Sequence, residues 1–331
     1  MQGPFEHTDI ISNYIQLIPE KKIAHLIIPR LWEQSHGQIS TSLQRHFQSL
    51  CVINFSEALR ISSTCLREIL ISCPNIEELE VTNIGGWEHR TSITLGDAVA
   101  ESWVCTRLKK LTMAVRIALD TYDSDFDFVN DVSENDRRAM FREAMARLAQ
   151  LLGQLTELEE LDLRRSGREV IEASELVMDN SEVGINAARD QNYPFRKPTG
   201  YRNGWLHGLL TLGNPDTGNP NTLCYFKDLT KLTVVKGTLQ ESEQEYHQNM
   251  RSEEATWIRD NWRSLVTLEV MYEGFRQDMN QNTFNLSEPL KSMFMIRGDL
   301  QLVNKARHPL CYESYVAYMN RLREWNLSHH Q

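Results

Sequence analysis

Leu158-Glu-Glu-Leu161-Asp-Leu163 is the stretch that decides the fold of this 331-residue chain. Its apolar residues follow the pattern apolar-x-x-apolar-x-apolar, so that the last two alternate with a polar residue. Alternation of this kind is typical of a short strand with one buried face. We therefore predict a strand centred on Leu161, with that side chain in a core and its polar neighbours turned outward.

The same pattern returns along the chain, which makes an internal repeat the first hypothesis. The clean copies have as central residues Leu79, Leu111, Leu161, Leu232 and Leu268, and the weaker copies Leu26, Leu50, Leu209 and Met293. The mean separation is (293 − 26)/8, or about 33 residues, which is longer than the roughly 20–29 of regular leucine-rich repeats. We expect strands centred on 50, 79, 111, 161, 232, 268 and 293 to pair in parallel and in sequence order, because each repeat buries its apolar face only against its neighbours.

Parallel neighbours need a return segment, which a helix usually supplies. Three helices are predicted: one over residues 63–73, ended by Pro74; one after a Ser133–Asp136 capping box, with apolar residues from Met140 to Leu155; and one over 253–262. The alternative is an ordinary α/β fold in which the strands share this pattern by chance.

The favoured architecture is a single α/β domain, an irregular leucine-rich-repeat solenoid shaped as a ribonuclease-inhibitor-like horseshoe, with parallel strands on its concave face. Residues 1–45 would form an N-terminal cap and residues 46–298 the repeats, with insertions at 114–135 and 164–204. The amphipathic residues near the C-terminus predict a helical cap over 299–331. A short helix at 170–177 and otherwise a long loop are expected in the second insertion.

Composition excludes several classes of function. The formal net charge is −10 and the Lys and Arg residues are scattered, whereas nucleic-acid and anionic-membrane binding need a basic patch. No apolar run approaches the ~18 residues that span a bilayer. The N-terminus lacks the features of a signal peptide, so we expect an intracellular protein. The six cysteines, at 51, 65, 73, 105, 224 and 311, are expected to be reduced core thiols.

The sequence carries no pattern for catalysis or for a cofactor. GxGxxG, GxxxxGK[ST], GxSxG and HExxH motifs are absent, so we expect neither an enzyme nor a bound cofactor. The nearest approach to a metal site is the acidic stretch 123–134, whose carboxylates match positions 1, 3, 5, 9 and 12 of a calcium loop. Phe128 occupies the position at which such a loop needs glycine, so an acidic solvated loop is the favoured interpretation.

Two phrases, Cys73-Pro-Asn-Ile76-Glu-Glu-Leu79-Glu-Val81 and Leu155-Thr-Glu-Leu158-Glu-Glu-Leu161-Asp-Leu163-Arg164, resemble fungal leucine-rich-repeat proteins of the ribonuclease-inhibitor-like class. Trp262-Arg-Ser-Leu265-Val-Thr-Leu268-Glu-Val270 is similar, and the resemblance covers about residues 45 to 300. Many such proteins begin with an F-box, which would imply a substrate adaptor of an SCF-type ubiquitin ligase. Leu17-Ile-Pro-Glu20 is similar to an F-box opening, but the next residues run into repeat-like strands instead of a three-helix module.

The outward positions of the strands are the candidate site. We expect a partner protein, polar or basic, to bind Glu78, Glu80, Thr82, Lys110, Thr112, Glu160, Asp162, Arg164, Lys231, Thr233, Glu269 and Met271, with Ala114, Val235 and Thr267 on the same face. Three functions stay open: a binding scaffold, a ligase adaptor, and a metal-dependent regulator or enzyme that uses residues 123–134.

The calcium hypothesis is directly testable. We predict that titration of the protein with calcium in a calorimeter shows no binding at physiological concentrations, because Phe128 blocks the sharp turn that the loop requires. A micromolar isotherm that Asp123→Ala abolishes would contradict this prediction.

Overall fold

The computed structural model describes residues 10–28, 36–55, 61–81, 92–116, 134–170, 199–205, 209–213, 220–242, 250–273, 288–297 and 300–304. Within them the chain is an α/β fold built on a ten-stranded sheet. The strands are β1 (His25–Ile27), β2 (Val52–Asn54), β3 (Glu78–Val81), β4 (Ile93–Thr94), β5 (Lys110–Arg116), β6 (Glu160–Val170), β7 (Thr199–Trp205), β8 (Val234–Ser242), β9 (Thr267–Glu273) and β10 (Gln301–Asn304). The helices are α1 (Ile10–Leu17), α2 (His36–Gln44), α3 (Ser63–Ser72), α4 (Leu95–Val99), α5 (Glu134–Gly153), the 3-10 helix η3 (Leu223–Phe226), α8 (Ser252–Asn261) and α9 (Glu288–Ile296).

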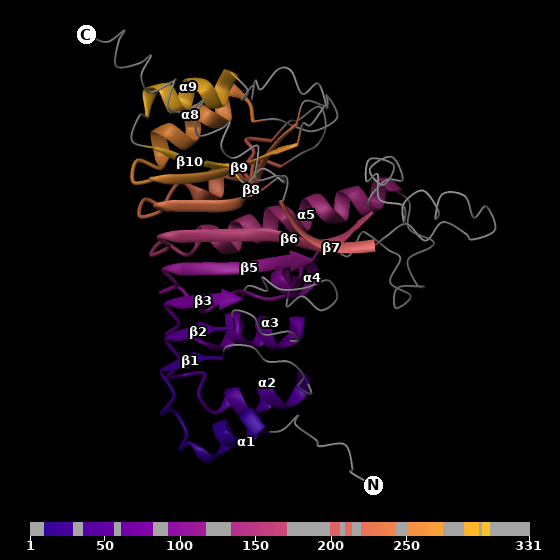
Figure 1. The fold of residues 1–331 in the computed structure, drawn as a ribbon, viewed down its shortest axis with the longest axis vertical. Coiled ribbons are helices and arrows are strands. Elements are labelled where there is room, and N and C mark those ends of the chain that lie inside the picture. The colour runs from indigo at the N-terminus through magenta and orange to yellow at the C-terminus, as the bar shows by residue number, and fades with distance from the viewer. Residues whose placement is uncertain are drawn as a thin grey trace, which may run out of the picture.

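The sheet is parallel along its main path and follows the order of the chain. The path runs β1-β2-β3-β5-β6-β8-β9-β10, and every neighbouring pair on it is parallel. Figure 1 shows these strands stacked one above another from the N-terminal to the C-terminal end. Off this path β4 pairs with β5 in parallel and β7 with β6 in antiparallel. The predicted parallel pairing in sequence order is therefore confirmed.

One apolar position per strand is aligned across the sheet. The aligned row is Leu26, Ile53, Leu79, Leu111, Leu161, Val235, Leu268 and Leu302. The six central members, from Ile53 to Leu268, are at most 1% exposed. The core thus lies between this row and the helices, as the period-two pattern predicted.

Two strand centres were predicted three residues too early in the chain. The strands lie around Ile53 and Val235, whereas Leu50 and Leu232 precede β2 and β8. Both leucines are fully buried, because they occupy the turn before the strand and point into the same core. Leu50 and Ile53 are apolar residues three positions apart, and so are Leu232 and Val235, so the repeat pattern fits a strand centred on either member of each pair.

The last predicted strand is also wrong. Met293 lies in α9, where it is 3% exposed, and the terminal strand of the sheet is β10. Leu209, the centre of the poorest copy, is fully buried in a bend. Three-residue spacing of apolar side chains suits a helix as well as a strand followed by a turn, which explains the misassignment of residues 290–295.

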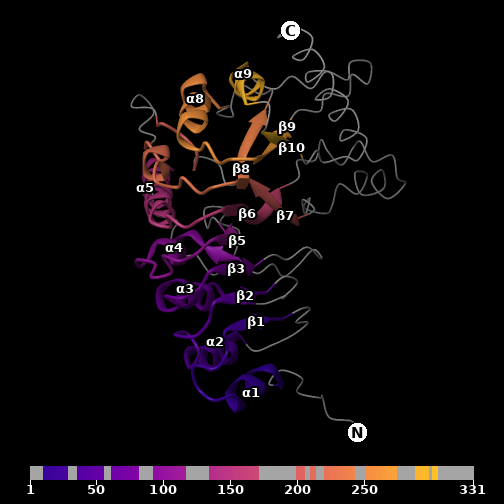
Figure 2. The ribbon, with the colours of Figure 1, turned by 90° about the vertical axis from the view of Figure 1, so that its left-hand side faces the viewer.

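The helices lie on one side of the sheet. In Figure 2, α2, α3, α4, α5 and α8 stand to the left of the strands, and the opposite face carries no helix from the described part of the chain. The predicted helices at 63–73, 140–155 and 253–262 are confirmed as α3, α5 and α8. Ser62 caps α3, since its hydroxyl accepts the N–H of Cys65 at 3.1 Å.

The end of α5 shows why one glycine is needed. A Cβ placed on Gly153 would lie 2.1 Å from the backbone oxygen of Tyr225 in η3. The close approach of two backbones leaves no space for a side chain there. Gly153 thus lets the long helix α5 pack against the segment that leads into β8.

The segments expected as caps and insertions contribute strands. Residues 1–45 include α1, β1 and α2, and β1 pairs with β2. Residues 164–204 begin and end in strand, because β6 continues to Val170 and pairs with β7. The prediction that a helix begins at residue 170 was therefore wrong. β10 lies within residues 299–331, and residues 305–331, like most of the 114–135 insertion, lie outside the described residues.

The thiols are partly as expected. Cys65, Cys73 and Cys105 are free and buried, Cys51 is free and half-buried, and Cys311 lies outside the described residues. Burial raises the pKa of Cys65 and Cys105 to about 12, so both stay protonated and unreactive at neutral pH. Cys224 is the exception to the expected core position, because its side chain is exposed.

We predict that Leu161→Ala lowers the free energy of unfolding by about 2–5 kcal/mol, through lost apolar transfer and a residual cavity. Leu161 is 1% exposed at the centre of the aligned row. Urea denaturation of the two proteins measures the difference. Met140→Ala, a change at a side chain 63% exposed on α5, is the matched control, and equal losses from both changes would contradict the assignment of the core.

Candidate protein-binding face of the sheet

The parallel register places the outward side chains of neighbouring strands in rows across the helix-free face. One row contains Val52, Glu78, Lys110, Glu160, Val234 and Thr267; the other contains Asn54, Glu80, Thr112, Asp162 and Lys236. Members of a row come from strands that lie about 4.8 Å apart in a sheet. Residues more than a hundred positions apart in the sequence are thereby brought onto one surface.

Four carboxylates give this face its charge. Glu78 is exposed, and Glu80, Glu160 and Asp162 are half-buried, so all four reach solvent. The pairs on β3 and on β6 are separated by β5, which carries Lys110 between them. With Lys110 and Lys236 as the basic members of the rows, the formal charge of the face is 2 − 4 = −2.

Glu80 is held within the face by two neighbours. Its carboxylate accepts the side-chain N–H of Asn54 at 3.2 Å and lies 3.4 Å from the Lys110 ammonium. Both charged side chains are about one-third exposed, so the ion pair adds at most about 1 kcal/mol. Its main consequence is to fix the direction of a carboxylate at the centre of the surface.

Two predicted site residues have the expected register but are not accessible. Thr112 is 8% exposed and Glu269 is 1% exposed, although both stand at outward positions. Thr112 lies between Glu80 and Asp162 of the adjoining strands. Ala114, expected on the same face, is likewise buried. The accessible charges of the face are therefore concentrated on β3, β5, β6 and the start of β8.

Three other expected positions are corrected by the register of β8. Val235 points inward and is fully buried, whereas Lys231 and Thr233 precede the strand. Thr233 donates its hydroxyl to the backbone oxygen of Glu159 at 2.9 Å, and Lys231 pairs with Glu157. Lys236, which the sequence interpretation missed, takes the outward position opposite Asp162.

The remaining predicted residues are described only in part. Thr82 lies outside the described residues, and for Arg164 and Met271 the backbone alone is described, in β6 and β9. Arg164 pairs in register with Ala114 and with Trp205 of β7. β7 therefore borders the same sheet next to the acidic pair on β6.

A basic cluster lies at the rim where the strands begin. The Glu77 carboxylate accepts hydrogen bonds from Arg107 at 2.6 Å and from Lys109 at 2.7 Å. The hydrogen bond from Lys109 is the main cause that lowers the pKa of the Glu77 carboxyl, and the positive charge of Lys109 is the next. Arg107 also donates to Asn75 at 3.4 Å. These cations are engaged at the rim, so they leave the negative bias of the face itself in place.

β8 is irregular next to this surface. Its register against β9 shifts between Val235 and Leu239, and Gly237 there has a φ of 73°. A bulge that needs a left-handed residue explains why glycine stands at this position. The bulge changes the direction of the strand just beyond Lys236.

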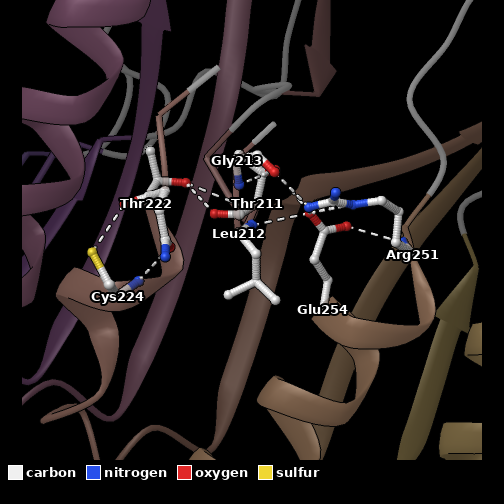
Figure 3. Close-up of polar contacts among 8 residues, drawn as sticks. Thr211, Leu212, Gly213, Thr222, Cys224, Arg251 and Glu254 are labelled. Carbon is white, nitrogen blue, oxygen red and sulfur yellow. Dashed lines mark hydrogen bonds and ion pairs between the residues drawn. The ribbon is translucent and has the colours of Figure 1, made fainter. Parts of the chain in front are cut away.

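The other polar centre of the molecule is the buried carboxylate of Glu254, shown in Figure 3. One oxygen, Oε1, accepts the Thr211 hydroxyl at 2.8 Å, the Leu212 N–H at 3.0 Å and the Arg251 guanidinium at 2.8 Å. The other, Oε2, accepts the backbone N–H of Arg251 at 2.9 Å. The cluster therefore ties the 209–213 segment to the start of α8.

The part of the chain that the structure describes holds no group of three or more His, Cys, Asp or Glu side chains placed to bind a metal ion. None of its helices combines the length and apolar character needed to cross a membrane. A scan against protein-family models finds no match, and no curated protein matches the chain.

We predict that Glu254→Gln lowers the free energy of unfolding by about 1–3 kcal/mol, because the neutral amide loses the ion pair and leaves a buried donor without an acceptor. The side chain of Glu254 is 5% exposed, while its partner Arg251 is 44% exposed, so the loss stays below that of a fully buried pair. Glu253→Gln, at the exposed neighbour in the same helical turn, is the control. Identical urea midpoints for the two variants would show that the cluster is not structural.

Proposed function

We propose that this chain is a leucine-rich-repeat-like solenoid and a protein-binding scaffold, which takes a polar, basic partner protein on the helix-free face of its sheet. The observation that carries the proposal is the register: Glu78 and Glu80 on β3 and Glu160 and Asp162 on β6 stand in the same two rows. In a solenoid each strand contacts only its neighbours, so outward residues form one continuous surface.

The charge of the face supports a basic partner. Four accessible carboxylates against two lysines give a negative potential, which steers oppositely charged proteins and speeds their association. The side chains of Asn54 and Lys110 contact the Glu80 carboxylate from two neighbouring strands, so the polar groups of the face form contacts across its surface. A surface of this type fits another folded protein better than a small molecule, for which a concave apolar pocket is usual.

A role as ubiquitin-ligase adaptor is the second candidate, and it rests on the family resemblance. Residues 10–44 contain α1, β1 and α2, with β1 in the sheet, so the described part of this region is a mixture of helix and strand. Binding of the purified protein to the adaptor subunit of an SCF-type ligase tests this role directly. No binding would leave the scaffold function alone.

The experiment for the main proposal compares two triple variants with the same change of charge. Glu80→Lys, Glu160→Lys and Asp162→Lys reverse the face, whereas Glu101→Lys, Glu143→Lys and Glu253→Lys change exposed carboxylates of the helical side. Each immobilised protein is exposed to the same cell extract, and the association rates of the recovered proteins are measured at several salt concentrations. We expect basic proteins that bind the parent and the control variant to lose at least about tenfold in association rate with the face variant at low salt.

Folding of both variants is checked by circular dichroism and by their urea midpoints. If the face variant folds, yet binds the same proteins with an unchanged rate and unchanged salt dependence, the helix-free face is not the binding surface.

A further inference from the structure

The N-terminal end of the sheet carries an unusual concentration of exposed apolar side chains. Of the nine large apolar residues exposed in the described part of the chain, four lie between residues 14 and 27: Tyr14, Leu17, Ile18 and Ile27, which are 65%, 79%, 37% and 64% exposed. A patch of this kind marks an interaction site more often than a scattered apolar residue does.

The backbone at this end also has unused capacity for hydrogen bonds. β1 is the terminal strand of the path, and its only sheet partner among the described residues is β2. The backbone oxygen of Ala24 accepts the N–H of Val52 at 3.1 Å, and the N–H of Ile28 donates to the backbone oxygen of Asn54 at 2.9 Å. Alternate residues along 24–28 therefore face β2. By the alternation of a parallel ladder, His25 and Ile27 direct their N–H and C=O groups away from the sheet.

A groove lies beside this free edge. It has a volume of about 710 Å³, and α1 forms one wall with Ile11, Tyr14, Ile15 and Ile18, while residues 22–28 form the other. Figure 1 shows α1 below β1, at the end of the stack of strands. An added strand would place apolar side chains between these walls and would continue the ladder of β1.

Basic side chains lie beside the groove. Exposed Lys21 and Lys22 directly precede residues 23–28 of its wall, and Arg45 follows α2. Arg45 pairs with Glu20 at 3.4 Å, and Lys22 lines the groove itself. A second copy of the chain would set this positive end against itself, whereas an acidic partner would be attracted.

We propose that the groove between α1 and the outer edge of β1 binds an extended segment of a partner protein, with apolar side chains at alternate positions and acidic residues at the end beside Lys21 and Lys22. The segment pairs its backbone with His25 and Ile27 and adds a strand to the sheet. The groove adjoins the N-terminal end of the helix-free face, because Ile27 is paired in register with Asn54 of the outward row, but it lies two strands away from the nearest acidic pair, on β3.

The test uses two fluorescein-labelled peptides, Asp-Asp-Ile-Thr-Val-Thr-Ile and its counterpart with Lys-Lys in place of Asp-Asp, and measures anisotropy against the full chain. We expect the acidic peptide to bind at least about tenfold more tightly at low salt, because charge decides between two peptides of equal apolar content. Ile27→Lys should weaken this binding at least about tenfold, and Lys22→Glu should reverse the preference between the peptides. Met140→Lys, at an equally exposed side chain on α5, should change neither.

Strand addition is separated from simple apolar contact by methylation of peptide nitrogens. Two versions of the acidic peptide carry N-methyl groups on alternate residues, so one version loses the N–H groups that face β1 and the other loses those that face solvent. We expect one version to lose binding and the other to keep it.

Three outcomes would overturn the proposal: no saturable binding of the acidic peptide up to millimolar concentration, equal effects of the two methylated versions, or equal binding to Ile27→Lys. Analytical sedimentation of the parent protein tests whether a second copy of the chain occupies the groove. A dimer that Ile27→Lys dissociates would assign the groove to a second copy of the chain instead. The triple variant of the helix-free face should bind the acidic peptide at least as tightly as the parent, because its new lysines attract acidic residues, and this keeps the result distinct from that of the proposed function.

Discussion

The shared register of the parallel strands is the constraint on which the rest of the structure depends. From β2 to β9, each strand on the main path buries one apolar residue in the same row, and such a residue is desolvated only when its neighbours on both sides are in place. Leu79, Leu111 and Leu161 meet in this way although they are separated by tens of residues. Because side chains alternate along a strand, fixing the inward row also fixes which residues face outward. The acidic face is thus a direct consequence of core packing.

The sequence predicts this arrangement well where the apolar triplet is unambiguous. Around Leu79 and Leu161, polar residues flank the central leucine, and the third residue beyond it is polar, Thr82 or Arg164, so no competing register arises. Around residues 50 and 232, apolar residues continue for another three positions, so two registers bury the same number of side chains. β-branched residues decide these cases: Val52-Ile53 and Val234-Val235 form the strands, while Leu50 and Leu232 fill the preceding turn. Because the centre of β8 was predicted three residues too early, the predicted site included Lys231 and omitted Lys236.

Other features depend on contacts that a single sequence does not contain. Glu269 has an outward register, yet it is 1% exposed, and nothing in its neighbours Leu268 and Val270 distinguishes it from Glu80 in β3. The antiparallel pairing of β6 and β7 joins segments separated by about thirty residues of polar, turn-rich sequence, in which local propensity favours a loop. The buried cluster at Glu254 joins α8 to a segment some forty residues earlier. Long-range contacts of these kinds override local pattern, and only the folded chain reveals them.

The two proposed binding surfaces differ in which groups the sheet leaves available to a partner. In the middle of the sheet β5 is paired with a strand on each side, so recognition on the helix-free face comes from side chains, and charge dominates there. At β1 the ladder of the described strands stops, and N–H and C=O groups that point away from β2 adjoin exposed apolar side chains. An edge of this kind is a hazard for uncontrolled association, which natural sheets limit with charges beside the edge. Lys21 and Lys22 meet that description: they repel an identical positive end and attract an acidic segment. The same two side chains can therefore protect the edge against self-association and select the partner that covers it.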